Sequence, residues 1–535
     1  MLGLGPAAPA EPPSARGGFS GYSSGAVVAV RALEPSRSAP LVEATVGRSV
    51  AAVDSRGLAG PVEDELAGVG RPAALPPGAK SYGRGAGVDL AVGGGSPLDL
   101  LPLPLPATVD AAAPPDKAAR RAEAAPLPVN PLLSATLLRA EAAPVWSDAS
   151  CVLGQPLGFG LGSAADVRIL DVPPVGAAAG LVGGRPPDRA VGQSRSFTHL
   201  MPNGDGSFGL VAETRQTLAP VTIFGGTAQS VIVEVLGEVS LRVAASGKPG
   251  GSTIRYGPTG DPAPSAPILR IGVGDAVIQL TVAQVFGSAP LVVPLAPGLQ
   301  ALVGGRPRRP APSQRAVAED EPPEQRPDGT RGAAAVDLAR ITLLQQPPGA
   351  RPRLAEVRVG HLEASAAVPP GGVACPLPVR KEATPTLIDP GGRFRWLISI
   401  PSSAAVLAGI RCDLVDIRAV DTTSAPSGVE FALLSASHGG RIDGNVIRWP
   451  SLGRYRPGDP PLVLEVEGQV ASGSSAGFLR DTVVVDAGLD ACTGGAAGAS
   501  LTSTSAENPQ ESRAATRLNG VFTLLGPETG RPDGL

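Results

Sequence analysis

The stretch VIVEVLGEVSLRV, residues 231–243, decides the fold of this chain. Every second residue from Val231 to Val243 is apolar except Gly237. The opposite side is shared by four polar residues: Glu234, Glu238, Ser240 and Arg242. A period of two residues is the pattern of a β-strand with one buried face. Because a typical strand has only about 5 to 6 residues, we expect a bulge or bend at Gly237. The stretch therefore predicts a long, half-buried antiparallel sheet.

The composition indicates a chain of many short strands joined by turns. Glycine and proline number 70 and 59 of the 535 residues, but 43% of all residues are hydrophobic, which is too many for a generally disordered chain. The net charge is −3, and no basic stripe interleaves with aromatic residues, so we expect no nucleic-acid partner. No apolar run is long enough to span a membrane, so we expect no transmembrane segment. We expect no cofactor.

Strand-like runs and breaks organise the first two thirds of the chain. Residues 1–18 are predicted to be disordered, and residues 19–373 to form one large, irregular antiparallel β-domain. Within it, the repeated prolines of residues 96–127 predict an extended connector or a long surface loop. Residues 305–332 have almost no apolar side chains and predict a flexible excursion. This excursion interrupts one domain, because the strands after it still need partners.

One segment of this domain has a helical pattern. In NPLLSATLLRAEA, residues 130–142, Asn130 suits a helix cap, Pro131 suits the first turn, and leucines recur at helical intervals. We therefore predict a helix there.

A second unit begins after residue 373. Runs such as FRWLISI, CDLVDIRAVD and PLVLEVEGQV give six or seven short strands in roughly 120 residues, which is typical of an immunoglobulin-like sandwich. We predict such a sandwich for residues 374–494. In HGGRIDGNVIRW, residues 438–449, turn residues precede a short strand, and Trp449 is predicted to fill the core between the sheets. Residues 495–535 are predicted to be a mostly flexible tail.

The cysteines form an even, widely spaced set without a CxxC pair: Cys151, Cys375, Cys412 and Cys492. Zinc ligation normally needs closely spaced pairs, so the alternatives are two disulfides or four free thiols. We favour disulfides, and with them an exported protein. One pairing joins Cys375 to Cys412 within the sandwich and leaves Cys151 with Cys492. The other joins Cys151 to Cys375, which staples the two domains, and Cys412 to Cys492. The sequence does not choose between them.

The three histidines give no catalytic constellation. His199, His361 and His438 lie far apart in the sequence, and no nucleophile-elbow motif accompanies them. His361, in VRVGHLEASA, is predicted to be a strand residue with a satisfied hydrogen bond, and His438 to lie in a turn. We predict no catalytic residue and no enzyme.

Three further motifs suggest sites but are explained more simply by structure. PNGDGSFG places Asn203, Asp205 and Ser207 as in half a calcium loop, but the later Glu is missing, so we predict a hairpin turn and no metal site. GFGLGS, residues 158–163, lacks the spacing of a phosphate-binding loop, and its glycines are predicted to let backbones approach closely. Two acidic clusters are predicted to be solvated surface instead of a glycosidase pair: Glu63 with Glu65, and Glu319 with Asp320 and Glu321.

The second unit resembles a known domain. In GNVIRWPSLGRYRPGDPPLVLEVEGQV, Trp449, Gly453, Pro457 and Gly458 match the bacterial surface-protein repeat domain, which has an immunoglobulin-like fold. More broadly, FSGYSSG, SYGRGAGVDLAVG, CVLGQPLGFGLGSAADVRIL and VRVGHLEASAAVPPGGVACPLPV, followed by this unit, resemble actinobacterial choice-of-anchor G surface proteins over residues 19–494. The resemblance implies an exported protein that is attached at its C-terminus by one of several anchors.

Together these patterns predict a non-enzymatic structural or adhesive protein of the actinobacterial cell surface. Strand edges can pair subunits by β-augmentation into a filament or coat, so the expected partners are further copies of the chain and a cell-wall or surface glycan. Two alternatives stay open. One is a secreted carbohydrate-binding or carbohydrate-active protein, although only 3% of the residues are aromatic. The other is a phage-like structural protein.

Overall fold

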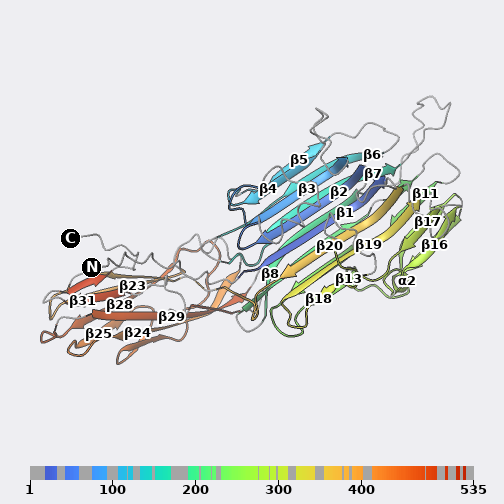
Figure 1. The fold of residues 1–535 in the computed structure, drawn as a ribbon. Helices are drawn as coiled ribbons and strands as arrows, with labels where there is room; N and C mark the ends of the chain where they lie inside the picture. Colours follow the sequence, from blue (N-terminus) through green and yellow to red (C-terminus); the bar gives the residue numbers. More distant parts are fainter. Residues whose placement is uncertain are drawn as a thin grey trace, which may run out of the picture.

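The chain folds into antiparallel sheets with almost no helix (Figure 1). The computed structural model describes residues 18–32, 42–58, 75–92, 107–116, 118–124, 133–147, 151–169, 191–203, 207–218, 220–223, 230–274, 276–287, 289–296, 299–310, 321–343, 355–375, 377, 379–384, 388–401, 412–475, 478–490, 500–503, 514–518 and 522–525. Among these residues the only α-helix is α2, Val282–Val285. The predicted all-β fold class is confirmed.

Sheet I is a nine-stranded antiparallel sheet with the first strand of the chain near its centre (Figure 1). Its order is β16-β17-β19-β20-β1-β2-β3-β4, with β18 beside β19. Residues 21–29 of β1 are all buried, which fits a central strand of small side chains covered on both faces. The strands are β1 (Ser20–Ala32), β2 (Val42–Asp54), β3 (Ser81–Val92), β4 (Thr108–Ala113), β16 (Leu291–Ala296), β17 (Leu299–Val303), β18 (Glu324–Gln325), β19 (Arg331–Leu343) and β20 (Ala355–Ala367).

Sheet II is a twelve-stranded sheet that packs against sheet I. Its main order is β13-β12-β9-β8-β7-β10-β11-β14-β15, with β21 beside β9 and with β6 and β5 following β7. Strands β7 and β10 run parallel to each other. The strands are β5 (Arg120–Ala124), β6 (Leu133–Ala142), β7 (Gly158–Ile169), β8 (Val191–Pro202), β9 (Ser207–Thr217), β10 (Val221–Ile223), β11 (Val231–Val235), β12 (Val239–Ala245), β13 (Thr253–Pro258), β14 (Pro267–Val273), β15 (Ala276–Thr281) and β21 (Val373–Ala374).

The alternating run at residues 231–243 forms two strands of sheet II. Its apolar positions are all buried: Val231, Val233, Val235, Val239, Leu241 and Val243. The extended conformation is interrupted around Gly237, so the run forms two strands. Strand β11 pairs with β10 and β14, whereas β12 pairs with β9 and β13. The predicted alternation is confirmed, but Gly237 separates two strands instead of bending one.

Sheets I and II approach each other most closely at glycines. A Cβ atom added to Gly158 in β7 would lie 2.7 Å from Tyr82 O in β3 and 2.9 Å from Ala52 O in β2. Cβ atoms at Gly160 and Gly162 would meet backbone oxygens of the same two strands at still shorter distances. The prediction that the glycines of GFGLGS let backbones approach closely is confirmed.

A crease crosses sheet I at one rung. The regular strand pairing is interrupted at four residues that lie opposite one another: Leu338 in β19, Gly360 in β20, Val27 in β1 and Gly47 in β2. Gly360 and Gly47 have φ angles of +67° and +59°, a conformation that glycine adopts without steric cost. The buried face of β20 changes from Val357 and Val359 to Leu362 and Ala364 across this rung. The crease therefore switches which residues face sheet II.

Three predictions for the first 373 residues need correction. Residues 133–142 form strand β6 and not a helix, because β6 pairs with β5 and β7 and buries Leu138, Ala140 and Ala142 at a period of two. The proline-rich segment 96–127 contains the strands β4 and β5. In the segment 305–332, β18 and a bridge from Arg308 to Ala335 pair with β19. Strands β17 and β19, on either side of that segment, are neighbours in sheet I.

The C-terminal strands form two further antiparallel sheets beyond one end of sheets I and II (Figure 1). Sheet III has the order β22-β23-β28-β25, and sheet IV the order β26-β27-β24-β29-β31-β32 with β30 beside β29. The strands are β22 (Arg380–Thr384), β23 (Arg393–Ile400), β24 (Asp413–Ser424), β25 (Phe431–Ala436), β26 (Arg441–Asp443), β27 (Val446–Trp449), β28 (Leu462–Val470), β29 (Phe478–Asp490), β30 (Ser500–Ser503), β31 (Ala514–Leu518) and β32 (Phe522–Leu525).

Alternate side chains of these sheets form a core. Phe394, Trp396 and Ile398 of β23 are buried, as is Trp449 of β27, whose Nε1 donates a hydrogen bond to Ser437 O at 2.8 Å. The core position predicted for Trp449 is therefore confirmed. Three strands, β30 to β32, lie where the sequence predicts a mostly flexible tail, and they pair with β29 and with one another. The immunoglobulin-like identity of this unit stays a prediction.

Candidate functional site

A buried disulfide joins distant parts of the chain. Cys151 and Cys375 are bonded, with their Cα atoms 5.6 Å apart and both side chains only 5% exposed. Cys151 lies between β6 and β7, and Cys375 directly follows β21, just before β22 begins at Arg380. The pairing of Cys375 with Cys412 is therefore wrong, and the alternative pairing of Cys151 with Cys375 is correct. Cys412 is also disulfide-bonded, while Cys492 lies outside the described residues.

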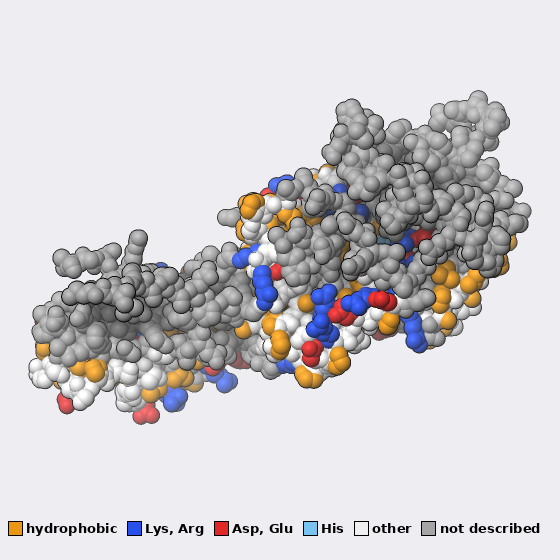
Figure 2. Space-filling model, in the orientation of Figure 1, with side chains coloured by type: hydrophobic (Ala, Val, Ile, Leu, Met, Phe, Trp, Pro, Cys, Tyr) orange, Lys and Arg blue, Asp and Glu red, His pale blue; other side chains and the backbone are white. Residues whose placement is uncertain are grey.

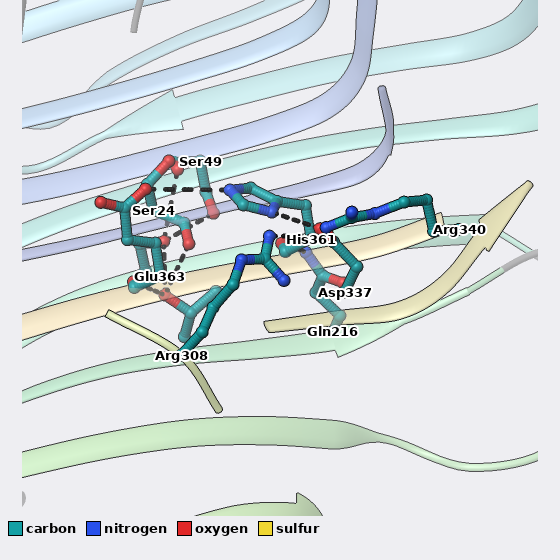
Figure 3. Close-up of polar contacts among 10 residues, drawn as sticks. Ser24, Ser49, Gln216, Arg308, Asp337, Arg340, His361 and Glu363 are labelled. Carbon is teal, nitrogen blue, oxygen red and sulfur yellow. Dashed lines mark hydrogen bonds and ion pairs between the residues drawn. The ribbon is translucent and has the colours of Figure 1, made fainter. Parts of the chain in front are cut away.

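The candidate site is a cluster of charged side chains beside the crease in sheet I (Figure 3). We call it the charged cluster; its members are Arg308, Asp337, Arg340, Glu356, Arg358, His361 and Glu363. Leu362 and Ala364 of β20 belong to the core between sheets I and II. Successive side chains of a strand point to opposite faces, so His361 and Glu363 lie on the face of sheet I away from sheet II.

Asp337 of β19 is the centre of the charged cluster. Its Oδ2 accepts hydrogen bonds from Arg308 Nη2 at 2.8 Å and from Arg340 Nη2 at 2.9 Å. Its Oδ1 lies 2.7 Å from His361 Nδ1, and His361 Nε2 lies 3.8 Å from Glu363 Oε2. Both carboxylate oxygens of Asp337 are thus engaged, although the side chain is only 3% exposed.

Electrostatics keep this network charged. Burial on its own would raise the pKa of Asp337, but Arg308, Arg358 and the hydrogen bond with His361 hold it well below its usual range. Burial likewise opposes the charge of Glu356, yet Arg358 and Arg340 lower its pKa. For His361, hydrogen bonds to Asp337 and Glu363 outweigh burial and raise the pKa. Each acid therefore has a cationic partner that compensates for its desolvation.

A second polar layer lies between sheets I and II and contacts the backbone of β20 (Figure 3). Ser49 Oγ in β2 lies 2.7 Å from Ser194 Oγ and 2.8 Å from Ser196 Oγ, both in β8. Thr214 of β9 donates to Ser24 O at 3.2 Å, and Gln216 Nε2 donates to His361 O at 2.8 Å. Buried hydroxyl and amide groups that find partners across two sheets fix how the sheets align.

The arrangement around His361 suits a structural network. The prediction that His361 is a strand residue with a satisfied hydrogen bond is confirmed, since it lies in β20 and contacts Asp337. The hydrogen bonds of Ser49 go to other serines, whereas the ring nitrogens of His361 face Asp337 and Glu363. The charged cluster therefore holds β19 and β20 together on both sides of the crease.

The other histidines also lie in structural positions. His438 lies in a turn, as predicted, with Nδ1 3.0 Å from Ser437 Oγ, which also accepts a hydrogen bond from the backbone N–H of Glu465 at 2.8 Å. His199 lies in β8 and stacks on Phe197 at a ring distance of 5.8 Å. Burial, with Arg242 and Arg215 nearby, lowers the pKa of His199 to about 4.

The motif PNGDGSFG lies at the β8–β9 hairpin, as predicted. The backbone N–H of Asn203 donates to Ser207 O at 2.9 Å, and the side-chain amide of Asn203 donates to Ser207 Oγ at 3.0 Å. Asp205 lies outside the described residues. In the described part of the chain no group of three or more His, Cys, Asp or Glu side chains has the arrangement of a metal site.

The structure describes only one member of the two acidic clusters. Glu321 is exposed and lies 3.9 Å from Arg309, which agrees with solvated surface. The remaining members, Glu63, Glu65, Glu319 and Asp320, lie outside the described residues. Sequence reasoning missed the role of Asp337, whose signal is the single carboxylate in the mostly apolar strand AAAVDLARITLL.

Comparison of the sequence with models of known protein families and with curated proteins finds no match. Within the described segments, no helix has both the length and the apolar character needed to cross a bilayer.

Proposed function

We propose that the chain is an exported, non-enzymatic structural or adhesive protein of the actinobacterial cell surface. The observation that carries the proposal is the buried Cys151–Cys375 disulfide, because structural disulfides persist in oxidising compartments outside the cytosol. This bridge ties sheet II to the segment that leads into sheet III. The resemblance to choice-of-anchor G surface proteins, and the immunoglobulin-like fold that it implies for residues 374–494, support the same proposal.

The character of the buried polar groups also supports a structural role. The carboxylate of Asp337 is occupied by Arg308, Arg340 and His361, and the hydroxyl of Ser49 by Ser194 and Ser196. A catalytic acid or base needs a free position from which it reaches a substrate. Side chains whose partners are other protein groups contribute rigidity instead, which is what a stalk, coat or adhesive scaffold requires.

Exposed strand edges suit self-association. Strand β16 is an edge of sheet I and exposes 58% of Val292, and β15 is an edge of sheet II and exposes 64% of Val277. Figure 2 shows hydrophobic side chains gathered at this end of the molecule. An exposed edge with apolar side chains is the usual template for pairing with a strand of another chain. We therefore place the contact between copies at β15 and β16.

The export proposal is tested on protein taken from its native producer. Brief trypsin treatment of intact cells should release peptides of this chain, since arginines are frequent in it. Alkylation without reduction should leave Cys151 and Cys375 unlabelled, and alkylation after reduction should label both. Release only after cell lysis, together with labelling before reduction, would contradict export.

Self-association is tested separately by light scattering of the purified full chain. Val292→Lys should reduce the high-mass species, because a lysine on an exposed edge opposes strand pairing. Val463→Lys is the matched control, since Val463 is 43% exposed but lies on β28, which has strands on both sides. Equal assembly of both variants and the wild type would exclude this edge.

A further inference from the structure

A second buried charged group lies between sheets III and IV. It consists of Lys381 in β22 and two carboxyl groups, Asp421 in β24 and Asp481 in β29. The three side chains are 0%, 1% and 0% exposed. The chain has only four lysines, Lys80, Lys117, Lys248 and Lys381. Burial of a lysine with two acids is rare because each charge must leave water.

The lysine amine contacts both acids. Lys381 Nζ lies 2.5 Å from Asp421 Oδ1 and also contacts Asp481 Oδ2. Thr423 is paired with Asp481 in the β24–β29 ladder, and its Oγ1 donates to Asp481 Oδ1 at 3.2 Å. Lys381 Nζ also lies over the ring of Trp396, 5.0 Å from the ring centroid. A nitrogen in contact with a carboxyl oxygen is also close to the carboxyl carbon bonded to it, so folding already brings together the two atoms that an amide bond would join.

The group contains two acidic side chains but only one basic side chain. One ammonium cannot neutralise two carboxylates, and an uncompensated buried charge is costly. Burial raises the pKa of Asp481 well above its usual range, and the neighbouring Asp421 adds to this effect against the opposing influence of Lys381. Burial and the second acid therefore favour the neutral carboxylic acid form of Asp481, beside Lys381 and Asp421.

The geometry points to a covalent amide between Lys381 Nζ and the side-chain carboxyl carbon of Asp481, formed without an enzyme once sheets III and IV have packed. Asp421 accepts a proton from the Lys381 ammonium, and the resulting amine attacks the carboxyl carbon of Asp481. The C–N bond forms, the C–OH bond breaks, and the hydroxyl leaves as water with the second proton of the amine. The products are a neutral amide, a neutral Asp421 acid and one water molecule, so atoms and charge balance and no oxidant or cofactor is needed.

Removal of the buried charges favours this reaction. Before it, the core holds an ammonium and a carboxylate; after it, the core holds only neutral groups that form hydrogen bonds with one another. Thr423 orients Asp481 for attack, while Asp421 acts only as the proton acceptor. The bond would join the first strand of this unit, β22, to its long strand β29.

The test is the mass of the full chain after complete denaturation, reduction and alkylation. The expected mass is lower than that of the sequence by one water molecule. Trypsin should then yield a branched peptide of residues 381–393 joined to residues 481–513, because trypsin does not cleave after an acylated lysine. The full sequence mass together with separate linear peptides would overturn the proposal and leave an ion pair. A branch to residues 419–441 would assign the bond to Asp421 and overturn the roles given to the two acids.

Substitutions provide a second readout that distinguishes chemistry from folding. In Asp481→Asn the leaving group is ammonia, so the mass deficit should change from that of water to that of ammonia. Asp421→Ala should abolish the deficit, and Lys381→Arg should do the same. Asp486→Asn is the matched control on β29, since Asp486 is exposed and its loss should leave the deficit of one water unchanged. A water deficit that persists in Lys381→Arg would come from elsewhere in the chain and would refute the amide.

Discussion

The close approach of sheets I and II makes a single methyl group a severe perturbation. We consider Gly158→Ala, in which the added Cβ would lie 2.7 Å from Tyr82 O and 2.9 Å from Ala52 O. Ordinary contact begins at 3.4 Å, so β7 would have to move by 3.4 − 2.7 = 0.7 Å from β3 and by 3.4 − 2.9 = 0.5 Å from β2. Both obstacles are backbone atoms within ladders, which cannot rotate away as side chains do.

The loss of stability follows from the size of this displacement. Separation by about 0.5 to 1 Å removes a quarter to a half of the dispersion energy of each contact along the seam. Overpacking of a tight interior costs about 1 to 3 kcal/mol, and we expect about 2 kcal/mol for Gly158→Ala. Gly160→Ala should cost more, since its Cβ would meet Arg84 O and Val50 O at a shorter distance. Gly257→Ala in β13 is the control, because nothing lies within 4 Å of its Cβ.

The assay is native-state hydrogen exchange of β7 followed by mass spectrometry. A loss of about 2 kcal/mol in the free energy of opening corresponds to roughly 30-fold faster exchange of protected β7 amides. We expect the order Gly160→Ala, then Gly158→Ala, then Gly257→Ala, with the last close to wild type. Exchange in Gly160→Ala that matches Gly257→Ala would refute the argument that the glycines set the distance between the sheets.

Three further predictions concern the disulfide, the charged cluster and His199. Cys375→Ser opens a bridge with a sequence separation of 224 residues, so the chain-entropy model gives a loss of about 5 kcal/mol, measured by urea unfolding with and without reductant. Asp337→Asn removes the buried carboxylate that Arg308, Arg340 and His361 share and should cost about 3 to 5 kcal/mol in the same assay, whereas Asp443→Asn, at an exposed position, should have little effect. The pKa of His199 is lowered from 6.5 to about 4, so the unfolded chain binds the proton more readily and stability falls as the pH decreases from 6.5 to 4, by at most about 3 kcal/mol. His199→Gln should remove that part of the pH dependence, and an unchanged profile would contradict it.

The sequence predicts strands well wherever one face is buried. The run from Val231 to Val243 shows its alternation directly, and the glycines of GFGLGS signal a close backbone approach. The same reasoning fails at residues 130–142, where Asn130 and Pro131 suggest a helix start. Local capping preferences are worth about 1 kcal/mol, and pairing of β6 on both sides outweighs them.

The charged groups could not be assigned from sequence for a different reason. Asp337 and Arg308 are 29 residues apart in the sequence, and Lys381 is a hundred residues from Asp481. A single chain shows which residues are polar but not which strands become neighbours, so their partners depend on strand order. Histidines are the first candidates for site residues in a sequence. In this structure, however, the charged side chains with the least exposure are one lysine and two aspartates: Lys381, Asp421 and Asp481.

The position of β1 near the centre of sheet I also determines when that sheet can close. Ser20 of β1 pairs with Ala367 of β20, so one edge of the earliest strand lacks its partner until most of the chain has been synthesised. Cys375 follows β20 closely, and therefore the last strand of sheet I and the thiol that completes the bridge to Cys151 become available almost together. Over most of its synthesis the chain is thus an open assembly of hairpins, the state in which aggregation competes with folding. Completion of the sheet and formation of the covalent bridge form one late step, and any partner that protects the chain beforehand would recognise the free edge of β1.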